Sequence, residues 1–110
     1  MELRLVVAII RTHALEAVEK SLQEIGVRGL SVVRVRGYGE HANMFSRDRL
    51  VDQVKIEIYV EQDRVDSIVA AILDVAHSES PGNGIVAVLP VEKVYSVSTR
   101  REEAPNRIRS

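Results

Sequence analysis

The sequence predicts an α+β domain in which four strands form one antiparallel sheet and two helices cover one of its faces. Over residues 54–60, apolar and polar residues alternate strictly, which is typical of a strand with one buried face. Over 12–25 and again over 65–76, apolar residues recur every three or four positions, which indicates two amphipathic helices. Apolar runs around these segments complete the order strand, helix, strand, strand, helix, strand.

The first strand and the first helix follow from the start of the chain. Residues 3–10 form a continuous apolar run rich in Val and Ile, which is typical of a strand covered on both faces or lying at the centre of a sheet. In the helix that follows, Thr12 is expected to cap the first turn, because its hydroxyl can accept a hydrogen bond from a free backbone N–H. Gly26 is expected to end this helix, because glycine readily adopts the left-handed conformation.

The remaining elements follow from three further patterns. Valines and arginines are interleaved over 29–38, which predicts a half-exposed second strand, and 54–60 is the third strand. The segment 78–84 contains Pro81 and two glycines and ends the second helix. An apolar run over 85–89 predicts the fourth strand, which we expect to resume over 91–97.

This order of elements predicts the ferredoxin-like fold, a split pair of βαβ units with both helices on the same face of the sheet. The other face has no partner within the chain. Val33, Val35, Ile56 and Ile58 are expected on that bare face, and three copies meeting around an axis would bury it. A homotrimer is therefore expected.

Composition excludes several classes of protein. With 110 residues, 45% of them hydrophobic and 28% charged, the chain fits one globular domain. Fifteen Lys and Arg against sixteen Asp and Glu leave no basic field for nucleic acid, and the absence of Cys excludes disulfides and thiolate metal sites. No apolar run approaches the length of a membrane helix. We expect a cytoplasmic protein that is not itself inserted in a membrane.

Two glycine pairs are the features most suggestive of a ligand. Gly37-Tyr38-Gly39 follows the second strand, and Gly82-Asn83-Gly84 precedes the fourth. Glycines at this spacing let successive backbone N–H groups point into one concavity, which can cradle phosphate. Each pair taken alone is typical of a tight turn. Brought together across a subunit boundary, the two would form a cleft with the curvature of a phosphate group.

Besides the two glycine pairs, the chain has the predicted strand 54–58 and the segment 81–85, which leads into an apolar strand. With these features it resembles the PII nitrogen-regulatory family over residues 3–99. The resemblance implies a domain over 1–99, with a T-loop at 40–52 and a B-loop at 78–84, followed by a mobile tail over 100–110. It also implies that an adenine nucleotide binds in clefts between the subunits of a homotrimer.

Matched residue by residue, the family's binding positions fall on three groups of residues. Ser31 lies near the adenine, and Glu57 and Tyr59 lie on the strand whose backbone faces the base. Gly37 and Gly39 stand at the base of the T-loop, and Gly82 and Gly84 lie under the phosphates. The implied nucleotide-binding residues are Ser31, Gly37, Tyr38, Gly39, Glu40, His41, Glu57, Tyr59, Gly82, Asn83, Gly84, Thr99, Arg100 and Arg101.

The chain departs from the family where cations face the phosphates. Ile85, Ser96 and Ser98 stand where the family commonly has a lysine and two arginines, so we expect ADP or AMP to be favoured over ATP. Arg100 and Arg101 are candidate replacements. The T-loop is shorter and has no tyrosine, which excludes uridylylation in the family's usual manner. His41 and Gln53 replace the glutamine and lysine through which the family binds 2-oxoglutarate with a metal.

The expected function is that of a regulatory protein, not an enzyme. A bound nucleotide would order the loop and the tail, and the trimer would then bind or release a target such as a membrane transporter or a metabolic enzyme. A small anion such as bicarbonate is a candidate second ligand. Met44 and Phe45 beside a charged loop tip favour a docking role for this loop.

Two other functions occur on the same fold. One is a CutA-like structural or metal-tolerance trimer without nucleotide, in which carboxylates and the histidines at 13, 41 and 77 would hold a metal. The other is an acylphosphatase-type hydrolase, which needs an arginine and an asparagine converging on an anion loop. The glycine pairs argue against the first, and no such arginine and asparagine pair is found for the second.

Overall fold

The computed structural model describes residues 2–37, 51–77 and 84–104. None of the helices in these ranges is long and apolar enough to cross a membrane. The elements, in chain order, are β1 (Leu3–Arg11), η1 (Thr12–Ala14), α1 (Leu15–Glu24), β2 (Ser31–Gly37), β3 (Val51–Glu61), η2 (Gln62–Arg64), α2 (Val65–Ala76), β4 (Gly84–Val91), β5 (Tyr95–Ser96) and β6 (Arg101–Glu102).

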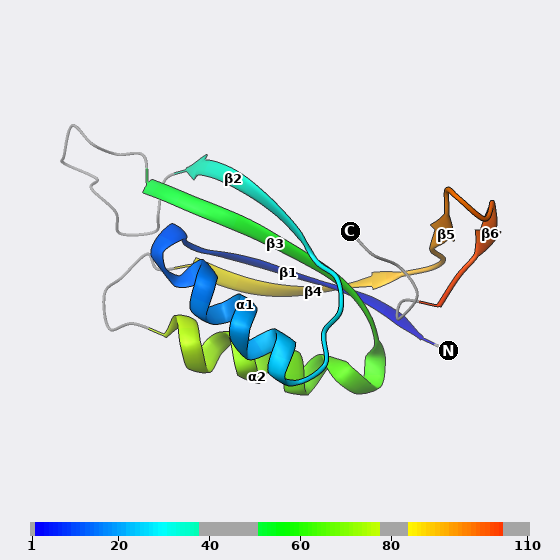
Figure 1. Ribbon diagram of the computed structural model, residues 1–110, viewed down its shortest axis with the longest axis horizontal. Coiled ribbons are helices and arrows are strands. Elements are labelled where there is room, and N and C mark those ends of the chain that lie inside the picture. The colour runs from blue at the N-terminus through cyan, green and yellow to red at the C-terminus, as the bar shows by residue number, and fades with distance from the viewer. Residues whose placement is uncertain (1, 38–50, 78–83, 105–110) are drawn as a thin grey trace.

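The four long strands form one antiparallel sheet in the order β2-β3-β1-β4, and α1 and α2 lie side by side on one face of it (Figure 1). This is the ferredoxin-like arrangement that the alternating hydrophobic patterns predict, and that prediction is confirmed. The two central strands, β1 and β3, pair over their whole common length, from Leu3 opposite Glu61 to Arg11 opposite Gln53.

The core lies between this sheet and the two helices. The alternating residues of β3, Val54, Ile56, Ile58 and Val60, are between 0% and 7% exposed. They share a face with Val6, Ala8 and Ile10 of β1, and they pack against Val18, Leu22, Ile68 and Ile72 of the helices. At roughly 1.5–3 kcal/mol for each fully buried aliphatic side chain, this layer is the main source of stability.

The face predicted for Ile56 and Ile58 is wrong. Both side chains lie under the helices, whereas Val33 pairs with Lys55 and Val35 with Gln53, on the other face of the sheet. A period of two residues shows which side chains share a face, but it does not show which of the two faces the helices cover.

The opposite face, here called the open face, is covered by no helix or strand of the described ranges. It carries apolar residues from the three strands other than β3, and polar residues from β3 itself. Ile85 is 62% exposed and Leu89 is 43% exposed. The open face is made up of Val33, Val35, Leu5, Val7, Ile9, Ile85, Ala87, Leu89, Gln53, Lys55, Glu57 and Tyr59.

The two ends of α1 differ in how far they match expectation. Thr12 does not cap the helix: it lies in η1, its Oγ1 is buried without a hydrogen-bond partner in the described ranges, and α1 begins after Ala14. Gly26 does end the helix, with a φ of +89°. Its N–H donates to the Gln23 carbonyl and the Val27 N–H to the Leu22 carbonyl, each at 3.0 Å, which is the Schellman motif.

The segments after β4 and before β3 also differ from expectation. The predicted continuation of the fourth strand over 91–97 is wrong: β4 ends at Val91, and β5 pairs with β6 in a small hairpin beyond the end of the sheet (Figure 1). The first part of the predicted tail therefore has regular structure. Val51 and Asp52, placed in the T-loop by the sequence, belong to β3. Residues 40–50, 78–83 and 105–110 of the predicted loops and tail lie outside the described residues.

An ion pair joins β2 to β3 on the helix side of the sheet. The Arg34 guanidinium lies 2.9 Å from Asp52 Oδ2 and 3.2 Å from Oδ1, and both side chains are largely exposed. Arg34, one of the arginines of the half-exposed second strand, is thus exposed to solvent and paired within its own chain. Because it is exposed, it contributes only about 0–1 kcal/mol to stability.

Gly84 should tolerate substitution much less well than Gly26. A Cβ at Gly84, where φ is +127°, would lie 1.9 Å from the Ile9 carbonyl oxygen of the neighbouring strand, whereas a Cβ at Gly26 meets only the Arg64 guanidinium at 3.9 Å. We expect Gly84→Ala to lower the free energy of unfolding by about 2–4 kcal/mol, and Gly26→Ala by about 1–2 kcal/mol. Urea titrations at one protein concentration measure both, and equal losses would contradict this account.

Candidate functional site

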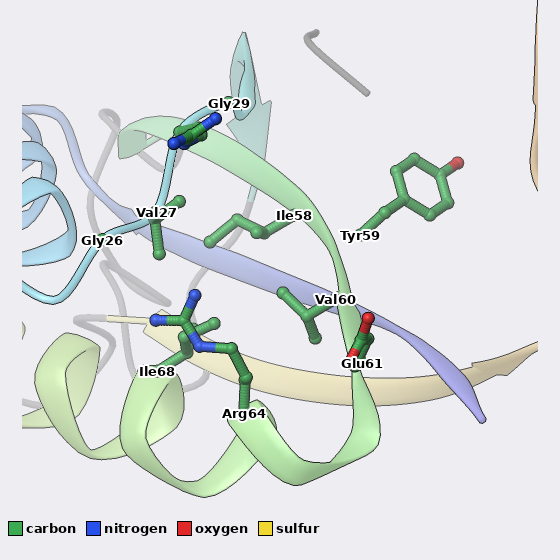
Figure 2. Close-up of a pocket in the computed structure, with 10 residues that line it drawn as sticks. Gly26, Val27, Gly29, Ile58, Tyr59, Val60, Glu61, Arg64 and Ile68 are labelled. Atoms are coloured by element: carbon green, nitrogen blue, oxygen red, sulfur yellow. The ribbon is translucent and has the colours of Figure 1, made fainter. Parts of the chain in front are cut away.

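A cavity of about 320 Å³ opens beside the end of β3, between the turn after α1 and the start of α2 (Figure 2). Its floor is apolar, and its rim carries two arginines and one carboxylate. The cavity is lined by Gly26, Val27, Arg28, Gly29, Ile58, Tyr59, Val60, Glu61, Arg64 and Ile68.

The cavity exists because β3 is longer than its neighbour β2. The β2–β3 ladder ends where Ser31 pairs with Glu57, yet β3 continues to Glu61. The segment 27–30 on the β2 side is not a strand, and no backbone hydrogen bond joins it to 58–61 in the described part of the chain. The edge of β3 therefore faces the cavity with backbone groups that lack a strand partner.

Arg64 closes one side of the cavity. It is the last residue of η2, and one of its terminal nitrogens donates a hydrogen bond to the Ile25 carbonyl at the end of α1. This bond satisfies one of the carbonyls that a helix leaves free at its C-terminus, and a cation is electrostatically favourable there. The start of α2 is thereby tied to the turn after α1, which forms another part of the cavity lining.

The residues predicted to lie near a base come together. Ser31 pairs directly with Glu57, and Tyr59 follows two positions later on the same face of β3. Tyr59 lines the cavity through its backbone side, while its ring points away from the cavity toward the open face (Figure 2). Sequence reasoning missed the neighbouring residues Arg28, Glu61 and Arg64, because nothing in their spacing indicates that a turn and a helix start meet beside β3.

The residues predicted to lie under phosphates are elsewhere. Gly37 pairs with Val51 and Gly84 with Ile10, so both lie at the opposite end of the sheet from Tyr59. Val51 and Tyr59 are eight residues apart along β3, which is roughly 26 Å at about 3.3 Å per residue. One chain therefore does not bring the predicted base and phosphate residues together. Tyr38, Gly39, Glu40, His41, Gly82 and Asn83 lie outside the described residues.

Thr99, Arg100 and Arg101 lie on the β5–β6 hairpin, beyond the same end of the sheet as the cavity (Figure 1). The Arg100 N–H donates to the Ser96 carbonyl at 2.9 Å, and the Thr99 hydroxyl donates to Glu103 Oε1 at 3.0 Å. Arg100 has a φ of +60°, the only positive φ at a non-glycine position among the described residues. The hairpin holds both arginine side chains exposed.

The two serines that replace arginines of the family contact each other. Ser96 Oγ and Ser98 Oγ lie 3.0 Å apart, within hydrogen-bonding distance, and Ser96 Oγ also accepts from the Thr99 N–H at 3.4 Å. These hydroxyls stabilise the hairpin turn. They bring no charge to the surface on which they lie.

Metal ligands do not converge in the part of the chain that the structure describes: no three His, Asp or Glu side chains there are placed to hold one ion. His13 is exposed within η1, His77 is exposed directly after α2, and His41 falls outside the described residues.

Comparisons with known proteins agree with one another. The family model described as nitrogen regulatory protein P-II matches residues 3–102. A nitrogen regulatory protein P-II homolog of Arabidopsis thaliana is 37% identical over 100 residues, covering 84% of this chain and 51% of the homolog. Nitrogen regulatory protein P-II of Pasteurella multocida is 34% identical over 102 residues, covering 86% of this chain and 91% of that protein. The chain thus spans about half the length of the plant relative and nearly all of the bacterial one.

A solved structure extends the similarity to three dimensions. The crystal structure of Arabidopsis thaliana PII bound to citrate superimposes with a TM-score of 0.78 at 35% identity, covering 92% of this chain and 85% of that one. The family's name describes regulatory proteins and not a catalytic activity. From its sequence, its fold and these relatives together, the chain belongs to the nitrogen regulatory protein P-II family.

Proposed function

We propose that three copies of this chain bind an adenine nucleotide in the clefts between them, ADP or AMP in preference to ATP, and regulate a target protein. The observation that carries the proposal is the separation within one chain of the predicted base and phosphate residues, at opposite ends of the sheet. A nucleotide can contact both groups only where two chains meet. The separation therefore favours a site shared between subunits.

The base side of such a site is the cavity beside β3. Its floor of Val27, Ile58, Val60 and Ile68 suits the flat apolar faces of a purine. The unpartnered edge of β3 offers backbone donors and acceptors to the polar edge of the base. Tyr59 is among its lining residues, and Ser31, where the resemblance to the family places adenine, follows two residues after Gly29 of the lining.

The phosphate side relies on backbone and carries few charges. Gly84 holds a conformation that other residues rarely adopt, which supports the expected cradle. Ile85 beside it is exposed and uncharged, and the hydroxyls of Ser96 and Ser98 contact each other. A backbone cradle can satisfy one or two phosphates, but each further phosphate brings negative charge that these residues do not compensate. Arg100 and Arg101 are exposed on the hairpin at the cavity end of their own chain, so those of a neighbouring chain would supply cations to these phosphates.

The regulated partner would be a transporter or a metabolic enzyme in the cytoplasmic compartment. Citrate is bound to the similar Arabidopsis protein, which supports a small carboxylate or bicarbonate as a second ligand here. A bound nucleotide would order the loop over 40–52, and the loop would bind the target differently in its ordered and its unordered state. Many regulatory proteins switch between two states in this way.

Assembly can be tested on the open face. Light scattering should give a mass three times the 12.3 kDa of the chain. Leu89→Lys should dissociate the assembly without unfolding the chain, because Leu89 is 43% exposed in the single chain and a buried lysine would be costly between chains. Leu73→Lys is the matched control, since Leu73 is 54% exposed on α2, away from the open face. A wild-type monomer at micromolar concentration would overturn the proposal.

Calorimetric titration tests the ligand. ADP or AMP should bind at least as tightly as ATP, since three family cations are replaced by Ile85, Ser96 and Ser98. Addition of 2-oxoglutarate should not strengthen ATP binding, because His41 and Gln53 replace the residues that support it in the family. Magnesium-dependent ATP binding that 2-oxoglutarate tightens would show instead that the family's usual chemistry persists.

The hairpin arginines give a separate test. Arg101→Ala should weaken ADP binding by about 1.5–3 kcal/mol, the range for a charge-assisted hydrogen bond, and leave the trimer intact. Lys20→Ala removes the same charge from the exposed side of α1 and should leave ADP affinity unchanged. If both variants bind ADP like the wild type, Arg101 does not replace the lost cations.

A further inference from the structure

Arg64 occupies an unusual position for a surface arginine. Its side chain extends from the start of α2 across the cavity toward Gly26, with Ile68 behind it (Figure 2). The hydrogen bond to the Ile25 carbonyl anchors one end of the guanidinium. The residue as a whole is half-buried, while the hydrogen bond that holds the guanidinium is exposed.

Most of its hydrogen-bonding capacity is still available to a ligand. A guanidinium carries five N–H donors, and a single bond to Ile25 uses one of them. Glu61 lines the same cavity, but among the described residues no ion pair joins it to Arg64. The cavity therefore contains a guanidinium that is held in place, carries a positive charge and can donate further hydrogen bonds above an apolar floor.

The opposite wall of the cavity is of a different kind. It is the edge of β3 past Glu57, whose backbone groups have no strand partner. A ligand that fills the cavity would place one polar edge against this backbone and another toward Arg64. A purine fits this requirement, because its ring nitrogens are acceptors located on different edges of a flat, largely apolar ring system.

We propose that Arg64 donates a hydrogen bond to a ring nitrogen of the bound purine and so contributes to recognition of the base. This inference rests on the proposed nucleotide binding and goes further, because it assigns recognition to the last residue of η2, directly before α2, which the sequence pattern does not single out. Arg64 acts by direct contact, while its bond to Ile25 fixes the guanidinium in place before the ligand arrives.

The test compares ADP with 1-deaza-, 3-deaza- and 7-deaza-ADP, each lacking one ring nitrogen, on the wild type and on Arg64→Met. At least one analogue should bind the wild type about tenfold more weakly than ADP. For that analogue, the difference from ADP should disappear in Arg64→Met, because the donor is absent. A loss of the Ile25 bond alone would lower thermal stability and weaken all four ligands equally, without this coupling.

Arg64→Gln provides a second variant if Arg64→Met does not fold, since its amide can still donate to the Ile25 carbonyl while losing the charge and the forked geometry. Arg64→Gln should also abolish the tenfold difference in affinity between ADP and the weaker-binding analogue. Wild-type affinities equal for all four ligands, or a difference that persists unchanged in the folded variants, would overturn the role of Arg64 and leave nucleotide binding standing. A wild type that binds none of the four would overturn the proposed function itself.

Discussion

The pairing of β1 with β3 is the interaction on which the rest of the structure depends. It aligns the apolar side chains of the two central strands on one face, and the helices cover that face. It also sets which residues lie on the open face and which lie at each end of the sheet. A shift of one residue in this ladder would place Ile56 and Ile58 on the open face and Lys55 and Glu57 in the core.

The candidate site forms because β3 is longer than its neighbour β2. β3 extends past the last residue pair it makes with β2, and the chain leaves α1 by a glycine turn that keeps the segment 27–30 away from it. Arg64 then fixes the distance between that turn and α2. The cavity is thus formed by backbone geometry and one hydrogen bond, and its polar character comes from a strand edge more than from side chains.

Much of the fold can be predicted from the sequence, because each element has a strong local signal. The alternation over β3, the amphipathic segments and Gly26 gave the elements and their order correctly. The face covered by the helices could not be obtained in this way, since it depends on how β1, α1 and α2 pack together. The β5–β6 hairpin was missed for a related reason: its hydrogen bonds join backbone groups to one another and short polar side chains to one another, in a stretch that has no hydrophobic period.

The site was predictable only where residues match a family motif. Ser31, Glu57 and Tyr59 lie next to one another at one end of the β2–β3 ladder, and their role in binding stays a prediction, whereas Arg64 and Glu61 belong to the cavity through tertiary contacts alone. The two halves of the predicted site lie at opposite ends of one sheet, a relation that depends on strand direction and register and so requires the three-dimensional structure.

The ion pair between Arg34 and Asp52 has a consequence for solubility. β2 is an edge strand, and its consecutive valines at 32 and 33 are exposed on both faces, which makes its free edge a template for pairing with strands of other molecules. Arg34, held extended by Asp52, places a charge immediately after these valines. A charge at this position disfavours pairing of the free edge of β2 with strands of other molecules, an effect that is independent of the small stabilisation the pair provides.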